Sequence, residues 1–216
     1  MAVRIEPLVT DEYYHVFNRG VAKQPIFTSK HDYSQALLTS NYYQYADQSL
    51  KLSRFKKLSY EDKEKFLSES KGLKPKLVQI VCFVFMPNHF HFLLKQLVDN
   101  GISKFIGQFC NSYTRYFNTV HNRVGHVFQG TFKSINVESE EQLIHLTRYI
   151  HLNPYVSSIV KKNTLSEYPW SSYPNYLQGG SNIIGMNPEK YRQFVVNHAD
   201  YARELELIKH QTLDLE

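Results

Sequence analysis

Long hydrophobic runs, tryptophan and cysteine are scarce in this 216-residue sequence, which has one Trp and two Cys. No apolar run approaches the roughly 18 residues that a membrane-spanning helix needs, which excludes such a helix. The N-terminus has no basic segment followed by a long apolar stretch, so we expect no secretory signal. Cys82 and Cys110 lie far apart in apolar segments, and we expect two reduced core thiols. These absences predict a cytoplasmic protein with no membrane partner.

Aromatic and basic residues are plentiful by contrast, with 16 Tyr, 14 Phe and a formal net charge of +5. The hydrophobic fraction of 42% and the charged fraction of 21% are those of a globular protein. Aromatic rings beside Lys and Arg suit base stacking on single-stranded nucleic acid, although most rings of a globular protein belong to its core. The composition therefore permits a nucleic-acid partner without requiring one.

Hydrophobic periodicity predicts the element order β–α–β–β–α–β–α before Pro154, which we expect to end the last of these helices. This is the split βαβ, ferredoxin-like order, so we expect an α+β fold with an antiparallel sheet and helices on one face. The expected strands are 13–18, 77–86, 89–95 and 131–137, and the expected helices are 30–45, 103–122 and 140–153.

Two segments stand outside this core. Residues 47–76 are dense in Lys, Glu and Ser, and we interpret them as a solvated insertion with a short helix opened by Ser59 and Asp62. The basic part of this insertion, residues 51–57, is a candidate contact for a phosphate backbone. We expect the chain to divide into a main domain, 1–160, and a C-terminal extension, 161–216, with a helix near 188–207.

His89 and His91 are the sharpest local feature. Side chains two residues apart on a strand point to the same face, so both imidazoles face one side of the sheet. Two imidazoles at that spacing can share one metal ion, although a bare His-x-His is more often an ordinary half-exposed pair.

Tyr149 and Asn153 form the second feature, four residues apart on one face of the predicted helix. An amide oxygen can bind a hard metal and a phenol can serve as a nucleophile, but a helical tyrosine is usually a packing residue. Taken with the two histidines, however, the set predicts a single chemistry. A divalent cation held by two imidazoles and an amide can bind a phosphate oxygen while the tyrosine attacks phosphorus.

Several motifs carry a resemblance to a known family. The run from Phe85 to Leu94 (FMPNHFHFLL) resembles the signature of HUH single-strand nucleases, in which two histidines flank a hydrophobic residue. Residues 125–134 and 149–154 are similar to the blocks that follow in one-tyrosine insertion-sequence transposases, and most similar to REP-associated tyrosine transposases. Residues 13–20 and 167–173 also match the flanking pattern of that family. One departure is Thr131, which stands where many members carry Arg.

The resemblance implies a role for each matching residue. His89, His91 and Asn153 would bind Mg²⁺ or Mn²⁺, and Tyr149 would become joined to a DNA 5′-phosphate. The substrate would be single-stranded DNA beside a hairpin, as in repetitive extragenic palindromes, and the protein would act as a monomer or a homodimer. Four basic residues are further candidates for phosphate contacts: Arg115, Arg123, Lys133 and Arg148.

Rival assignments remain open in the sequence. Tyr113 and Tyr116 are alternative nucleophiles, but both fall on the apolar stripe of their helix, which favours packing. The chain is alternatively a catalytically inactive DNA-hairpin binding or regulatory protein. It is also compatible with an RNA-binding module, because such modules share the element order and present exposed aromatic rings on their sheet.

Overall fold

The computed structural model describes residues 7–46, 50–73, 75–180 and 185–213, side chains excepted at 70–73 and 205–213. Residues 1–6, on which the expectation about a secretory signal rests, lie outside these ranges, as do 47–49 and 74 of the predicted insertion. A four-stranded antiparallel sheet with strand order β2-β3-β1-β4 forms the centre of the fold. Its strands are β1 (Tyr13–Arg19), β2 (Val78–Met86), β3 (His89–Gln96) and β4 (Lys133–Val137). The predicted α+β class and antiparallel sheet are confirmed.

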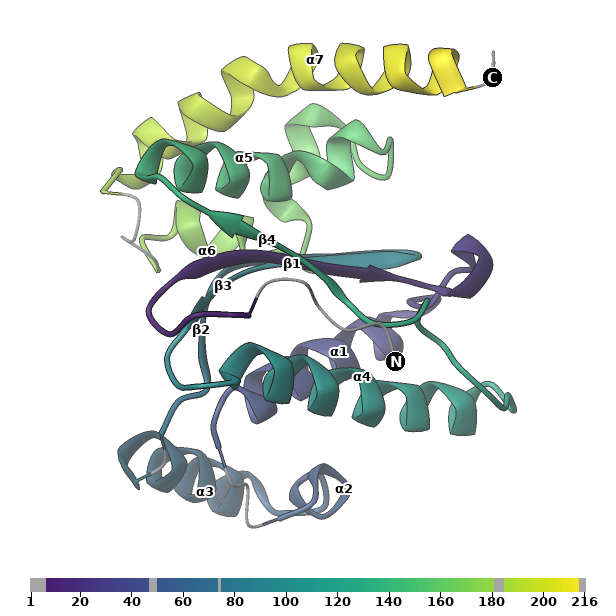
Figure 1. Cartoon of the computed structure of the whole chain (residues 1–216), viewed down its shortest axis with the longest axis vertical. Coiled ribbons are helices and arrows are strands. Elements are labelled where there is room, and N and C mark those ends of the chain that lie inside the picture. The colour runs from purple at the N-terminus through teal and green to yellow at the C-terminus, as the bar shows by residue number, and fades with distance from the viewer. Residues whose placement is uncertain (1–6, 47–49, 74, 181–184, 214–216) are drawn as a thin grey trace.

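Helices cover both faces of this sheet, so the expectation of helices on one face was wrong. Helices α1 (Lys30–Tyr43) and α4 (Gly101–Val120) pack on one face, and α5 (Glu140–Val156) packs on the other (Figure 1). The reason lies in β2 and β3, which carry apolar side chains on both sides. Phe90 and Phe92 belong to the core beneath α4, whereas Cys82, Val84 and Leu93 belong to the core beneath α5.

Pro154 does not end α5, contrary to expectation, and the helix continues to Val156. Proline lacks only its own backbone N–H, so within the last turn it removes a single hydrogen bond. The carbonyl of Asn153 still accepts from the backbone N–H of Ser157 at 2.9 Å, which closes the final turn.

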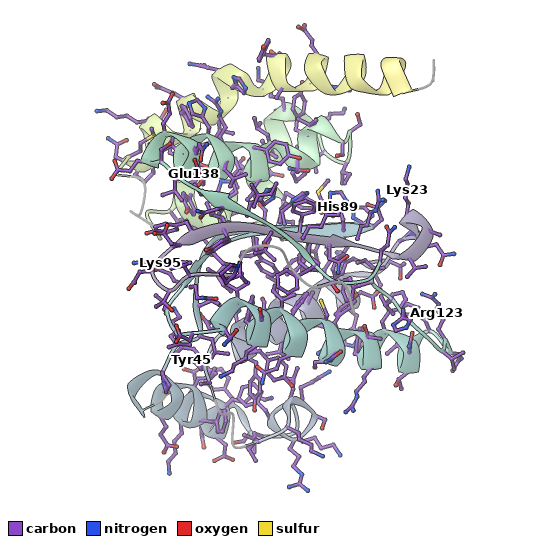
Figure 2. The ribbon with its side chains drawn as sticks, viewed as in Figure 1. Lys23, Tyr45, His89, Lys95, Arg123 and Glu138 are labelled. Carbon is purple, nitrogen blue, oxygen red and sulfur yellow. The ribbon has the colours of Figure 1, made fainter. Side chains whose placement is uncertain are left out.

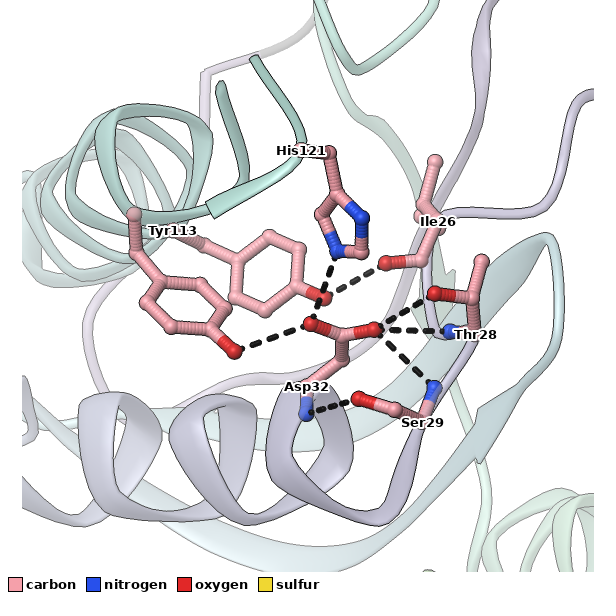
Figure 3. Close-up of polar contacts among 7 residues, drawn as sticks. Ile26, Thr28, Ser29, Asp32, Tyr113 and His121 are labelled. Carbon is pink, nitrogen blue, oxygen red and sulfur yellow. Dashed lines mark hydrogen bonds and ion pairs between the residues drawn. The ribbon is translucent and has the colours of Figure 1, made fainter. Parts of the chain in front are cut away.

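The junction between α1 and α4 is organised around the buried carboxylate of Asp32 (Figure 3). This carboxylate accepts hydrogen bonds from both the backbone N–H and the hydroxyl of Thr28 and from the backbone N–H of Ser29. Tyr116 and His121, at the far end of α4, donate to its other oxygen at 2.9 and 3.1 Å. One carboxylate thus caps the start of α1 and anchors the end of α4.

The charged insertion is less solvated than the sequence suggested. It forms α2 (Leu52–Phe55) and α3 (Tyr60–Leu73), and Leu52 and Phe55 are buried against Tyr42 of α1 in a small separate core. The expected cap is present, because the backbone N–H of Asp62 donates to the hydroxyl of Ser59 at 3.1 Å.

Residues after 160 share the second core with α5 and the sheet. They form α6 (Tyr173–Leu177) and α7 (Pro188–Leu213), with short 3-10 turns at Lys162–Glu167 and, earlier in the chain, at Val21–Lys23. Their backbone pairs with the outer edge of β2, where Ser172 N–H donates to the carbonyl of Phe83 at 3.0 Å. The division of the chain at residue 160 stays a prediction. Within the described ranges, no helix is long and apolar enough to cross a membrane.

Candidate active site

The hairpin of β2 and β3 sets the orientation of both predicted histidines. Pro87 and Asn88 form the turn, and His89 and His91 follow on β3 with their side chains on the face that α5 covers. Their ring centroids are 5.0 Å apart with an interplanar angle of 89°. Two imidazoles that bind one ion at about 2.1 Å have centroids roughly 5 Å apart, so this separation suits a shared cation.

A third imidazole, that of His15, joins them from β1. Because β1 pairs with β3, Phe17 lies opposite His91 and His15 lies opposite Leu93, all on the same face. The Nε2 atom of His15 is 2.8 Å from Nδ1 of His91, and both side chains are buried. Sequence reasoning assigned no role to His15, although strand alternation in residues 13–19 and the pairing of the two strands would have identified it.

Helix α5 brings Tyr149 to the same place. Its ring stands edge-on to His91 at 5.9 Å and to His15 at 6.2 Å between centroids, and half of the residue's surface is exposed. Asn153, one turn later, is buried and hydrogen-bonds with the side chain of His89, while its Nδ2 donates to the carbonyl of Tyr149 at 3.0 Å. The structure thus brings together all four residues that the sequence selected.

Burial keeps the three imidazoles uncharged. It lowers the pKa of His15 and of His89 to about 4, and it lowers the pKa of His91 well below its ordinary value. Neutral imidazoles retain a nitrogen lone pair, which is the form that binds a metal.

An open cleft of about 750 Å³ adjoins the two histidines. Arg19, Lys23 and Lys133 contribute three cations to its wall, and none of its described lining residues is acidic. Figure 2 shows Lys23 and His89 on the same side of the sheet. A wall with this charge suits the phosphate backbone of a nucleic acid.

Of the four basic residues predicted to contact DNA, only Lys133 lines this cleft. Arg123 lies near the end of α4, away from His89, and stacks over Phe117 at 5.6 Å (Figure 2). Arg115 lines a separate hollow of about 570 Å³ beside α1, α2 and α4. Arg148 stacks over Phe194 of α7 at 4.1 Å.

The sequence prediction missed Arg19 and Lys23. Arg19 stands opposite His89 in the pairing of β1 with β3, and its Nε donates to the side chain of Gln129 at 2.6 Å. The signal available in the sequence was Arg19 directly after the predicted strand 13–18 and Lys23 four residues later, but their position beside β3 depends on strand pairing.

The rival tyrosines are packing residues, as the apolar stripe favoured. Tyr113 is buried and donates to the carbonyl of Ile26 at 2.5 Å, and Tyr116 donates to Asp32. His151 points away from Tyr149 and is enclosed between Tyr191 and Ser172, at 2.6 and 2.7 Å.

The donor set fits a divalent cation. His89 and His91 supply two neutral nitrogens, and Asn153 supplies an amide oxygen, a hard ligand. No cluster of three or more His, Cys, Asp or Glu side chains suitable for a metal occurs among the described residues.

Comparisons with known proteins bear on the fold and on the family. No curated protein matches the sequence. A solved structure of a REP-associated tyrosine transposase bound to a REP hairpin is similar, with a TM-score of 0.52 and 13% identity over 86% of this chain and 91% of that one. A structure described as a putative transposase from Deinococcus radiodurans has a TM-score of 0.37 and 10% identity over 68% of this chain and 95% of that one. The first likeness supports the fold alone.

The family model described as "Transposase IS200 like" matches residues 52–153. This range contains His89, His91, Tyr149 and Asn153. This segment of the chain therefore matches the IS200-like transposase family.

Proposed function

We propose that this protein cleaves and rejoins single-stranded DNA beside hairpins, with Tyr149 as the nucleophile and a divalent metal, Mg²⁺ or Mn²⁺, as cofactor. The observation that carries the proposal is that the Tyr149 and His91 rings lie 5.9 Å apart between centroids, together with the contact of Asn153 with His89. These residues come from a hairpin and from a helix about 60 positions later, and their proximity supports the proposal.

The reaction follows from the chemistry of these groups. The phenol oxygen of Tyr149 attacks the phosphorus of a phosphodiester and loses its proton. A bond forms between the tyrosine and the 5′-phosphate, the bond from phosphorus to the 3′-oxygen breaks, and the 3′-oxygen takes up a proton. Because the linkage to the tyrosine is still a diester, a free 3′-hydroxyl can reverse the step and rejoin strands without ATP.

His89, His91 and Asn153 would hold the metal, which when bound supplies charge neutralisation at a phosphate oxygen. A free phenol with an ordinary pKa of about 10 is only about 0.1% ionised at pH 7, so either the site helps to deprotonate it or proton loss accompanies attack. Half exposure of Tyr149 leaves its ring accessible to a strand that enters from solvent.

The DNA partner is inferred from two observations. Three cations line the cleft next to the histidines, and the similar solved structure is bound to a REP hairpin. We propose that the cleft contacts the phosphate backbone of single-stranded DNA next to such a hairpin, with Lys133 as one contact. Arg115, Arg123 and Arg148 stay weaker candidates because they lie elsewhere. A monomer and a homodimer both accommodate the proposal.

The test is detection of a covalent adduct between the protein and a hairpin-bearing oligonucleotide, with Mn²⁺, on a denaturing gel. Mass spectrometry then maps the attached residue. Tyr149→Phe is expected to abolish the adduct and to leave hairpin binding intact, whereas Tyr60→Phe, a control at an exposed tyrosine of α3, retains it. An adduct that persists in Tyr149→Phe contradicts the assignment of the nucleophile.

The same assay separates the alternative functions. Hairpin binding without any adduct in the wild-type protein would favour a catalytically inactive DNA-hairpin binding or regulatory protein. An RNA-binding module of the split βαβ type needs an open sheet face with exposed rings. Here α5 packs on that face, over the buried His15 and His91, which weighs against this function.

A further inference from the structure

We infer that His15 is a positioning residue that holds His91 in the tautomer required for metal binding. The inference rests on the proposed function, because it concerns the same cation site. His15 is not one of the proposed ligands, and its polar contact with the site is made to the His91 ring.

The two ligand histidines are held in the same way, each through its Nδ1 atom. Nδ1 of His89 is 2.6 Å from Oδ1 of Asn88, and Nδ1 of His91 is 2.8 Å from Nε2 of His15. In each ring this leaves Nε2 as the nitrogen for a cation, and in His89 the same nitrogen is left for the contact with Asn153, the third proposed ligand. A neutral imidazole carries one proton, so the proton has to sit on Nδ1 for Nε2 to offer its lone pair.

The partner of His89 allows only one arrangement. The amide oxygen of Asn88 accepts hydrogen bonds and cannot donate them, so Nδ1 of His89 must carry the proton. The partner of His91 allows two arrangements, because Nε2 of His15 can either donate or accept. In the first, His91 keeps its proton on Nε2 and cannot bind a metal there. In the second, Nδ1 of His91 donates to His15 and Nε2 is available.

Occupancy of the site therefore selects the second arrangement. Metal-binding histidines almost always donate their other N–H to an acceptor, which fixes the ring and raises the basicity of the binding nitrogen. Here the acceptor is a neutral imidazole instead of the more common carboxylate or carbonyl. His15 consequently has to hold its own proton on Nδ1 whenever a cation is bound to His91.

The surroundings of His15 are those of a fixed acceptor. The residue is 8% exposed and stands opposite Leu93 in the register of β1 with β3. Its ring lies 5.0 Å from that of Phe17 and 6.2 Å from that of Tyr149, between centroids. The His15 ring therefore has two aromatic neighbours besides His91, to which it is joined by a 2.8 Å contact.

The experiment measures the binding of Mn²⁺ alone to the full chain by isothermal titration calorimetry, with no DNA present. His15→Phe keeps a planar ring but has no acceptor, and it is expected to weaken Mn²⁺ binding by about 10- to 100-fold. His15→Gln, whose side-chain oxygen can accept from Nδ1, is expected to recover a substantial part of this loss. His31→Phe, at an exposed histidine of α1, is the matched control and is expected to bind Mn²⁺ as the wild type does.

Wild-type affinity in His15→Phe would overturn the inference. His91→Ala and His89→Ala distinguish this failure from failure of the proposed function. If they too bind Mn²⁺ normally, the metal site itself is wrong, whereas if they alone lose binding, only the role of His15 is wrong.

A second measurement avoids any variant that fails to fold. Long-range ¹H–¹⁵N NMR of the wild-type protein saturated with Mg²⁺ reports the tautomer of each histidine. A proton on Nδ1 of His91 is the expected result. A proton on Nε2 of His91 refutes the inference.

Discussion

The carboxylate of Asp32 offers the sharpest test of how the α1 side of the molecule is held together (Figure 3). Asp32→Asn keeps the shape of the side chain but replaces one accepting oxygen by an NH₂ group. In the wild type this side chain accepts five hydrogen bonds, from Thr28 twice, Ser29, Tyr116 and His121. The new NH₂ group has to face some of these donors, so at least one of them is left unsatisfied in a buried site.

The magnitude follows from the pKa of this carboxyl. Although burial alone would raise it, the hydrogen bonds from Thr28, His121 and Tyr116 lower the pKa of Asp32 from 3.8 to about 2. A difference of that size is worth about 2.5 kcal/mol at about 1.36 kcal/mol per unit. With the cost of an unsatisfied buried donor added, we expect Asp32→Asn to lower the free energy of unfolding by about 2 to 4 kcal/mol at pH 7.

The effect should depend on pH in a defined direction. The folded-state pKa lies below the unfolded one, so the stabilisation is complete above about pH 5 and is lost as the pH falls towards 2. The linkage relation predicts that about 1 kcal/mol of the 2.5 is gone by pH 3. The difference in unfolding free energy between the wild type and Asp32→Asn should therefore be about 1 kcal/mol smaller at pH 3 than at pH 7.

Urea titration followed by circular dichroism, from pH 7 to pH 3, measures this gap. Asp62→Asn is the matched control, because Asp62 holds the corresponding position near the start of α3 but is exposed. We expect Asp62→Asn to cost no more than about 1 kcal/mol. A gap for Asp32→Asn that equals that of the control, or that stays constant down to pH 3, would refute the reasoning.

Three further predictions concern packing and DNA binding. Gly101→Ala should lower the free energy of unfolding in urea by more than about 2 kcal/mol, because the new Cβ would overlap a backbone carbonyl. Gly107→Ala on the same helix meets no atom within 4 Å and should raise the free energy of unfolding by about 0.5 to 1 kcal/mol. Equal effects of the two substitutions would contradict this reasoning. His151→Ala should lower the free energy of unfolding by about 2 to 4 kcal/mol in the same assay, because it removes two buried hydrogen bonds and leaves a cavity. His145→Ala, at an exposed position, should change it by no more than about 0.5 kcal/mol. A similarly small loss for His151→Ala would show that these hydrogen bonds do not stabilise the fold. Lys133→Gln should weaken the binding of hairpin DNA and reduce the slope of the logarithm of the binding constant against the logarithm of salt concentration by about 1, measured by filter binding. An unchanged slope would show that Lys133 does not contact the DNA.

Local patterns predicted most of the secondary structure, because each depends on neighbours in the chain. The long amphipathic spacing of α4 was expected at 103–122 and is observed at Gly101–Val120. The end of α5 was missed because a proline in the last turn removes only one hydrogen bond, which tertiary packing can offset. The second helical layer was missed because a strand that is apolar on both faces indicates that it is covered twice, but not by which segments.

The proposed site divides in the same way. The amino-acid order alone placed His89 beside His91 on one strand face and Tyr149 beside Asn153 on one helix face, since both spacings are fixed by backbone geometry. Only the tertiary structure decided that these two faces meet, that β1 contributes His15 and Arg19 to the same place, and that Arg115, Arg123 and Arg148 do not. The physical reason is that strand pairing and helix docking depend on burying apolar surface between segments far apart in the chain, and no periodicity within a single segment encodes which partner it will meet.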